Sequence, residues 1–390
     1  MRIGYFLGLV VLIFVVGFYG FIKAPKKTST LENRTLAQFS HMTLKTFLDG
    51  SFQDNFENAL SDQFIKSETI RVNYRRVLAN MPTFGLKDVV CENHYVAIPG
   101  GNDGHSTFNC EDYILRTPSA PTDFQQKSLQ TNIDNLGRLN SLTKTYYYVI
   151  NTSSAYNFEE NRLETNYADV LADNMVGSYK MKELECDDYE TYKKYFYKTD
   201  LHWNYIGSYQ GFLDIADLLG IKNPAKPTGT FTQNEQFFGS YARNLQKYDS
   251  PDDFIIYTFD IPEHDTVING VKKKYNHFEE FINHDYEYSR FDFYAYFYGQ
   301  NYGEIIFDFH QPEKENLLIV ADSFSNPLNE LIAQYFNKTY IIDLRYYKNE
   351  VKKDFALSEY LRDNKIDKTL LIISSEFFII KDNTTKGFEK

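Results

Sequence analysis

The chain has 390 residues, of which 43% are hydrophobic and 17% are aromatic, and its formal net charge is −12. Four of its 41 Lys and Arg residues lie within residues 1–27, which contain no acidic residue, so the rest of the chain carries −16. Such a surface repels phosphate groups, which argues against nucleic acid and anionic lipid as partners. The length allows one substantial core plus an insertion.

Residues 3–22 contain no charged side chain. A helix of this length rises about 30 Å, enough to cross the hydrocarbon core of a bilayer. A cleaved signal peptide would have a shorter apolar core and a small-x-small cleavage site, and no convincing site follows. We therefore expect residues 1–27 to be an uncleaved transmembrane anchor with a basic flank. Charges on both sides of the segment leave its orientation open.

Residues 28–120 are expected to form a juxtamembrane helical approach followed by a hairpin and a glycine-rich loop. Ser51 and Asp54 have the spacing of a capping box, which predicts a helix start. Apolar side chains then fall on one helical face, at Phe52, Phe56, Leu60 and Phe64. Burial of this face against the core is the favoured interpretation, and a membrane-surface or partner-binding role is the alternative.

The chain contains three cysteines. Cys91 and Cys110 flank the glycine-rich loop, and a disulfide between them could close it in an oxidising compartment. Cys186 is left without a partner. Because no pair has Cys-x-x-Cys spacing and no set of four ligands is complete, neither a structural zinc nor another metal is expected.

Residues 121–390 are expected to form an α/β domain, with a parallel sheet and helices on both of its faces. Short apolar runs predict strands at residues 146–150, 317–320, 340–342 and 370–373, and helical stretches alternate with them. Residues 225–310, rich in aromatic and turn residues, break this alternation. They are expected to be a β-rich insertion.

A serine follows the predicted strand at residues 317–320. Ser325 and Pro327 suit a helix start, so Ser323 is expected in a tight turn between strand and helix. Such a turn exposes the hydroxyl and aims backbone N–H groups, including that of Phe324, toward an oxyanion. The alternative interpretation is a turn serine that only caps the helix.

Asp200 and His202 are two residues apart, so both side chains would project from one face of an extended segment. A carboxylate in this place can orient the imidazole and stabilise its protonated form. A helical pattern follows and stops at Gly220. Trp203, the only tryptophan, is interpreted as packing that fixes the loop, with stacking on a sugar ring as the alternative. For Asp200 and His202, the alternative interpretation is that they belong to an ordinary polar loop.

Polar residues follow two further predicted strands. Asn151 and Ser153 come after the strand at residues 146–150, and Arg345 comes after the strand at residues 340–342. Ligands of parallel α/β sheets bind at the carboxyl ends of the strands. These residues are therefore candidates for lining one cleft with Ser323, and a structural role for each is the alternative.

The chain resembles the DHHW proteins, relatives of the alginate O-acetyltransferases within the SGNH-hydrolase group, over about residues 32–380. The fragments that carry the resemblance follow the family's order and are Glu32-Asn33-Arg34-Thr35-Leu36, Asp49-Gly50-Ser51-Phe52, Asp62-Gln63-Phe64, Asp200-Leu201-His202-Trp203, Phe238-Gly239-Ser240, Ser250-Pro251-Asp252, Ala321-Asp322-Ser323 and Asp343-Leu344-Arg345-Tyr346-Tyr347. Leu201 stands where the family has the first of two histidines. The acetyltransferase relatives also lack that histidine, so the triad is unaffected. Ala321 replaces the usual glycine and is small enough for the turn.

The resemblance implies an SGNH-like core with Asp200, His202 and Ser323 as a catalytic triad, and no cofactor. It implies a catalytic domain outside the cytoplasm, held at the bacterial cell membrane by one membrane-spanning helix. The implied acceptor is a polysaccharide, and the implied partner is a multispanning membrane O-acyltransferase that passes acyl groups outward.

Three functions agree with these features. The favoured hypothesis is transfer of acyl, most plausibly acetyl, groups onto a polysaccharide hydroxyl through an acyl-enzyme. A carbohydrate esterase would use the same triad, with water as the acceptor. A non-catalytic, carbohydrate-binding module at the cell surface could keep the fold. The presence of all three triad residues argues against this third hypothesis.

Overall fold

The computed structural model describes residues 25–29, 34–63, 69–70, 73–74, 77, 107–116, 123–158, 160–234, 236–245, 247–273, 294, 297–375 and 385–390. The chain divides into two compact units. One comprises Met1–Pro82 with Ala242–Asp249, and the other comprises Thr83–Tyr241 with Ser250–Lys390.

The first unit contains two short strands, β1 (Thr28–Ser29) and β2 (Arg34–Thr35), and the helices α2 (Leu44–Leu48) and α3 (Ser51–Gln63). The end of α3 holds the strand segment through side-chain hydrogen bonds. Asp62 accepts from the N–H of Ala37 at 2.8 Å, and the Gln63 amide donates to the carbonyls of Lys26 and Ala37 at 2.9 Å. The helix predicted from the capping box at Ser51 is therefore present.

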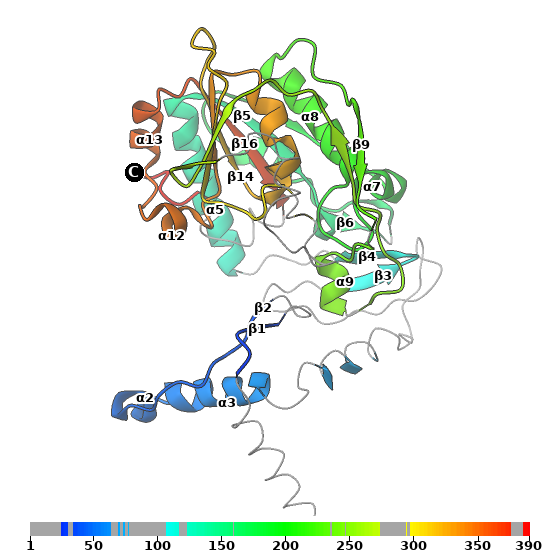
Figure 1. Cartoon of the computed structure of the whole chain (residues 1–390), viewed down its shortest axis with the longest axis vertical. Coiled ribbons are helices and arrows are strands. Elements are labelled where there is room, and N and C mark those ends of the chain that lie inside the picture. The colour runs from blue at the N-terminus through cyan, green and yellow to red at the C-terminus, as the bar shows by residue number, and fades with distance from the viewer. Residues whose placement is uncertain are drawn as a thin grey trace, which may run out of the picture. The chain divides into compact units, whose positions relative to one another are not determined.

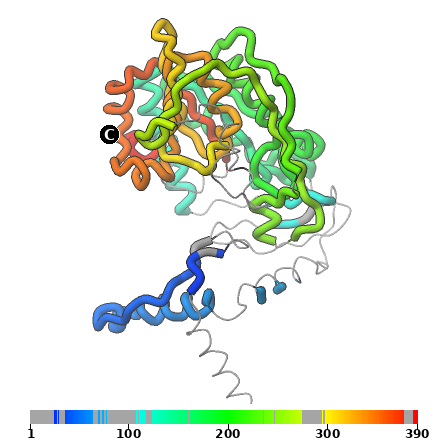
Figure 2. The backbone as a smooth tube through the Cα atoms, viewed as in Figure 1, coloured from blue at the N-terminus to red at the C-terminus, as the bar shows by residue number. Residues whose placement is uncertain are grey.

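The second unit is built on an eight-stranded sheet whose middle strands are β15 and β14, with β16 and β5 following toward one edge. Figure 1 labels β14, β16 and β5 beside one another, and Figure 2 shows the same backbone as a tube. The strands of this sheet, in spatial order, are β12 (Val271–Lys272), β11 (Asp265–Ile268), β13 (Glu304–Asp308), β15 (Lys338–Ile342), β14 (Leu317–Ala321), β16 (Lys368–Ser374), β5 (Lys144–Ile150) and β8 (Tyr179–Glu183). The four predicted strands are all present, as β5, β14, β15 and β16.

The sheet is mixed, which corrects the expectation of a wholly parallel sheet. The run from β15 to β8 is parallel, whereas β13 pairs antiparallel with β15, and β11 and β12 continue outward in antiparallel register. These three antiparallel strands come from residues 225–310. The expected insertion thus contains strands, and part of it extends the main sheet at one edge.

Helices cover both faces of this sheet, as predicted. Among the described residues from 123 on, the α-helices of this unit are α5 (Asp123–Leu142), α6 (Tyr167–Asn174), α7 (Tyr189–Tyr195), α8 (Tyr205–Leu219), α11 (Asn329–Ala333), α12 (Tyr347–Val351) and α13 (Leu357–Asp363), whereas α9 (Ser240–Leu245) runs from this unit into residues of the other. Alternate side chains of β5 divide between two apolar clusters: Tyr148 joins α7, α8 and α11, and Tyr147 joins α5, α6 and α13. Figure 1 shows α8 on one side of β14 and α5 and α13 on the other.

Shorter elements surround the sheet. They are the antiparallel pairs β3 (Thr107–Cys110) with β4 (Tyr113–Arg116), β6 (Tyr156–Asn157) with β7 (Arg162–Leu163) and β9 (Gly229–Thr232) with β10 (Ile255–Thr258), and the 3-10 helices η1 (Ser153–Ala155) and η3 (Ser323–Leu328). The first pair is the hairpin expected before residue 120.

Two expectations fall partly outside the described residues. The predicted anchor, residues 3–22, lies wholly outside them, and no helix within the described ranges is long and apolar enough to cross a membrane. Cys110 is disulfide-bonded and the buried Cys186 is free. Cys91, the partner that the sequence suggests, is also outside the described residues.

Candidate active site

The turn after β14 presents Ser323 at the carboxyl end of a central strand. The sequence predicted a helix beginning near Ser325, but the chain turns directly into the 3-10 helix η3 at Ser323 and continues as α11. Asp322 holds this turn, since one of its carboxylate oxygens accepts from the N–H of Phe324 at 2.9 Å and the other accepts from the hydroxyl of Ser374. The nucleophile candidate therefore stands on a rigid scaffold.

Ser323 and His202 are hydrogen-bonded although 121 residues separate them in sequence, with 2.8 Å between Ser323 Oγ and His202 Nε2. Both residues are largely buried, with 6% and 9% of their surfaces exposed. A neutral imidazole in this position can accept the hydroxyl proton through Nε2, provided that Nδ1 carries its own proton.

Asp200 supplies the partner for Nδ1. Its Oδ1 lies 2.5 Å from His202 Nδ1 and 3.0 Å from the backbone nitrogen of His202, and its Oδ2 accepts from the N–H of Ser240 at 2.6 Å. Burial alone would raise the pKa of Asp200, but the His202 imidazole and the two N–H donors outweigh it and hold the pKa well below its usual range. Asp200 is thus ionised and can fix the imidazole tautomer.

A second carboxylate holds the loop that carries Asp200. Asp252 accepts from the backbone nitrogens of Lys198 and Thr199, each at 2.8 Å, and from the Thr199 hydroxyl at 2.6 Å. Burial raises the pKa of Asp252 to about 6, against these hydrogen bonds, which favour the ionised form. The Thr199 hydroxyl oxygen in turn accepts from the N–H of Gly239 at 2.9 Å.

Gly239 lies directly against Asp200. A Cβ at this position would overlap the Cβ and Oδ2 of Asp200. Only glycine therefore lets the chain approach closely enough for the next residue, Ser240, to donate its N–H to the carboxylate. The Phe238-Gly239-Ser240 and Ser250-Pro251-Asp252 fragments act together here as the support of Asp200.

Trp203 fixes the position of the loop from the helix side. Its side chain is 1% exposed and packs against Gly211 of α8, where a Cβ would lie 2.7 Å from the indole Cζ3. Asn204 caps α8, its side-chain oxygen accepting from the N–H of Ile206 at 2.9 Å and of Gly207 at 3.1 Å. A buried indole cannot present a face to an exposed sugar ring, so the arrangement favours the packing interpretation.

The imidazole of His202 contacts two aromatic rings. The ring of Tyr294 stacks on it with centroids 3.9 Å apart and an interplanar angle of 15°, and the ring of Phe324 lies 4.9 Å away. Phe324 also contacts Trp203, at 5.6 Å between ring centroids. These apolar surfaces limit the access of water to the hydrogen bonds of the triad.

The other predicted site residues are engaged by the protein itself. The Asn151 amide donates to Asn166 and Glu183, at 3.3 and 3.1 Å. The hydroxyl oxygen of Ser153 lies 3.2 Å from the hydroxyl oxygen of Tyr241, and Ser153 is fully buried, with 0% of its surface exposed. The arrangement thus corrects the expectation that Asn151 and Ser153 line an open cleft, since both side chains are buried among structural partners.

Arg345 and Phe324 differ from expectation in a similar way. The Arg345 guanidinium forms a fork with Asp343, in which Nε donates to Oδ1 at 2.8 Å and Nη2 donates to Oδ2 at 2.5 Å. Burial opposes its charge, but Asp343 outweighs it and raises the pKa of Arg345. The Phe324 N–H, an expected oxyanion donor, is occupied by Asp322. The N–H of Ser323, at the start of η3, has no intrahelical acceptor by its position and is the better oxyanion candidate.

Sequence reasoning did not assign a role to Tyr294, Ser240 or Asp252. Tyr294 comes from the aromatic-rich insertion, where nothing in the spacing distinguishes it from its neighbours. Ser240 acts through its backbone N–H, which every non-proline residue has. Asp252 and Ser240 did carry one signal, because each ends a fragment by which the chain resembles the DHHW proteins.

No protein-family model and no curated protein matches the chain in sequence. Among solved structures, a DHHW family protein from Eubacterium siraeum is similar, with 17% identity, a TM-score of 0.55, and coverage of 76% of this chain and 97% of that one. Bacillus cereus PatB1 is also similar, with 19% identity, a TM-score of 0.55, and coverage of 72% and 99%. The same protein solved with a sulfonyl adduct has 18% identity, a TM-score of 0.56, and coverage of 72% and 98%. The resemblance to the DHHW proteins is thereby confirmed at the level of the fold.

Proposed function

We propose that this protein is a serine-dependent acyltransferase that moves an acyl group, most simply acetyl, onto a hydroxyl of a polysaccharide. The observation that supports the proposal most directly is the continuous hydrogen-bonded chain from Ser323 through His202 to the ionised Asp200. The sulfonyl adduct of PatB1, whose fold is similar, adds support, since sulfonyl reagents react with activated nucleophiles.

In the first half-reaction, His202 Nε2 takes the proton of Ser323 Oγ as the oxygen attacks the acyl carbonyl carbon. Asp200 stabilises the imidazolium that forms. The tetrahedral intermediate then collapses, the bond to the leaving group breaks, and His202 gives its proton to that group. The product is an acyl-enzyme with an ester bond at Ser323.

In the second half-reaction, a sugar hydroxyl gives its proton to His202 Nε2 and attacks the same carbonyl carbon. Collapse breaks the bond to Ser323, which regains its proton from His202. No redox change occurs and the residues return to their starting state. An esterase differs only in that water replaces the sugar hydroxyl, so burial of the triad favours transfer by keeping water out.

The proposal includes the place of the reaction. An apolar segment at residues 3–22 would hold the protein at the bacterial cell membrane as a single-pass protein with its catalytic unit outside. There a multispanning membrane O-acyltransferase would deliver the acyl group, because a cytoplasmic donor would be on the wrong side of the membrane.

An acyl-transfer assay tests this function. Purified protein is incubated with p-nitrophenyl acetate, with and without oligosaccharide acceptors, and p-nitrophenol release and acetylated sugar are measured separately. A transferase produces acetylated oligosaccharide and releases p-nitrophenol faster when acceptor is present. An esterase releases acetate at a rate that acceptor does not change, and a binding module releases no more p-nitrophenol than its Ser323→Ala variant.

A further inference from the structure

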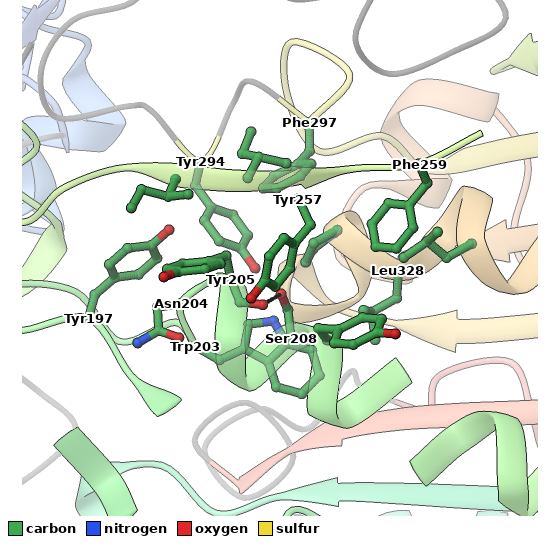
Figure 3. Close-up of a pocket in the computed structure, with 15 residues that line it drawn as sticks. Tyr197, Trp203, Asn204, Tyr205, Ser208, Tyr257, Phe259, Tyr294, Phe297 and Leu328 are labelled. Atoms are coloured by element: carbon green, nitrogen blue, oxygen red, sulfur yellow. Dashed lines mark hydrogen bonds between the residues drawn. The ribbon is translucent and has the colours of Figure 1, made fainter. Parts of the chain in front are cut away.

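An aromatic pocket lies beside the triad, between α8, β10 and the segment η3–α11 (Figure 3). Half-buried tyrosines stand around it, with Tyr257 in edge contact with Tyr205 and Tyr209 at 4.8 and 5.5 Å between ring centroids. None of the described side chains that line it carries a charge.

Two polar atoms of this aromatic pocket, Trp203 Nε1 and Tyr294 Oη, are both buried. The indole N–H interacts with the phenol oxygen as a hydrogen-bond donor, whereas the phenol O–H has no acceptor among the described residues. Figure 3 shows the indole nitrogen and the phenol oxygen turned toward the same space. An unmade hydrogen bond of a buried donor is costly, so a ligand oxygen that accepts from the Tyr294 hydroxyl would be favourable.

The pocket shares its walls with the triad. Trp203 follows His202 directly, and the ring of Tyr294 that lines the pocket is stacked on the His202 imidazole at 3.9 Å. Pro327 and Leu328, on the other side, belong to the 3-10 helix that begins at Ser323. A ligand in the pocket would therefore lie about one aromatic ring's thickness from the catalytic imidazole.

The lining selects a ligand by its chemistry. A carboxylate would be buried here without a neighbouring cation, which is unfavourable. A bare sugar ring would place several hydroxyls against aromatic carbon, which is also unfavourable. A short alkyl chain gains from burial against the rings, and a single carbonyl oxygen can accept from the Tyr294 hydroxyl. We propose that this pocket binds a short, neutral acyl group.

Two sources could supply that acyl group, and both rest on the proposed function. It could be the acyl chain of the donor, if the chain is longer than acetyl. It could instead be an acyl substituent already present on the acceptor sugar, for example on an amino group. In either case the pocket sets which molecule reacts rather than how the bond is made.

Binding can be measured without turnover, because Trp203 is the only tryptophan. The full chain carrying Ser323→Ala is titrated with acetamide, propanamide, butanamide and pentanamide while indole fluorescence is recorded. We expect saturable changes and a dissociation constant that falls about fourfold for each added methylene until the pocket is filled. Butanoate, which is charged, should bind more weakly than butanamide.

Two variants that fill the pocket keep the test decisive if one of them misfolds. Ile255→Phe narrows the pocket from β10, and Ser208→Leu narrows it from α8. Each should weaken butanamide binding at least tenfold, because the exclusion of one methylene from a fitted site has an effect of about this size. Val271→Phe, on an exposed position of β12, is the matched control and should bind as the parent does. An absence of saturable change in the parent, or undiminished binding by both folded filling variants, would overturn the proposal.

Turnover then distinguishes the sources. If the pocket holds the donor chain, kcat/KM of the active protein rises from p-nitrophenyl acetate to the butanoate, and Ile255→Phe removes the rise. If it holds an acceptor substituent, the esters show no such rise and transfer is faster onto an N-acylated oligosaccharide than onto its free amine. Amide binding with neither dependence would refute the pocket's part in the reaction. Amide binding without any turnover would refute the proposed function and leave the pocket assignment standing.

Discussion

Replacing Gly239 by alanine tests whether the support behind the triad is as close as the structure indicates. The added methyl group would overlap Asp200 at its Cβ and Oδ2, so either the carboxylate or the loop must move. Movement breaks the 2.6 Å hydrogen bond from the Ser240 N–H and displaces the partner of His202 Nδ1. Gly239 itself touches neither the nucleophile nor the imidazole, so any effect passes through Asp200.

The size of the effect can be bracketed. Complete loss of the orienting carboxylate in a serine triad costs about 10⁴-fold in kcat, and a misplacement of about 1 Å costs on the order of 10²-fold. We therefore expect kcat of Gly239→Ala on p-nitrophenyl acetate to fall between these limits. Overpacking should also lower the free energy of unfolding by ~1–3 kcal/mol, which urea denaturation would measure.

Two controls make the result specific. Gly229→Ala adds the same methyl group on β9, where it meets only Thr258 Oγ1 at 3.2 Å, and should leave kcat unchanged. In an Asp200→Ala background, Gly239→Ala should cost little further activity, because both changes disable the same group. A folded Gly239→Ala protein with wild-type kcat, or full additivity with Asp200→Ala, would refute the reasoning.

Three further predictions follow from the same geometry and from the sequence. Asp252→Ala leaves the donors of Lys198 and Thr199 without an acceptor and should destabilise the protein by about 3 kcal/mol in urea denaturation, with Asp252→Asn less affected. Burial raises the folded-state pKa of Asp252 to about 6, so its contribution to stability is present at acid pH and is lost as pH rises through 6, and Asp252→Asn should remove that dependence. Asp200 has the opposite effect on the pH dependence of stability, because its folded-state pKa is lowered. Its contribution to the free energy of unfolding is present at neutral pH and is lost as pH falls below the usual pKa range of aspartate. A protein starting near Thr28, without the apolar segment, should cleave p-nitrophenyl acetate normally. In cells it should acylate polysaccharide poorly, because tethering raises the effective concentration of the donor. Full cellular acylation by the shortened protein at native abundance would contradict this prediction.

The predictable part of the fold is the part encoded by local signals. The strands β5, β14, β15 and β16 are continuous apolar runs, and such runs identify buried strands without knowledge of their partners. The edge strand β8, Tyr179–Glu183, has alternating lysines and no fully buried side chain, so it carries no such signal. The antiparallel pairing of β13 with β15 depends on a long-range contact that no local pattern records.

The candidate site divides in the same way. The spacing of Asp200 and His202 predicted that their side chains share one face. Their meeting with Ser323 was implied by the resemblance to the DHHW proteins, because both residues lie between α7 and α8 rather than at the carboxyl end of a parallel strand. The engagement of Asn151 and Ser153 by buried partners was not predictable, because the same residue types serve clefts and cores alike. Nor was the stacking of Tyr294, which depends on how the insertion folds back over the imidazole.

Covalent labelling tests the central claim most directly. The full chain is treated with an aryl sulfonyl fluoride, and the modified peptide is identified by mass spectrometry in the wild-type protein and in His202→Ala. A triad that activates its serine predicts one sulfonyl group on Ser323, parallel loss of esterase activity, and no labelling when His202 is absent. Labelling at another residue, or full activity in Ser323→Ala, would contradict the serine mechanism.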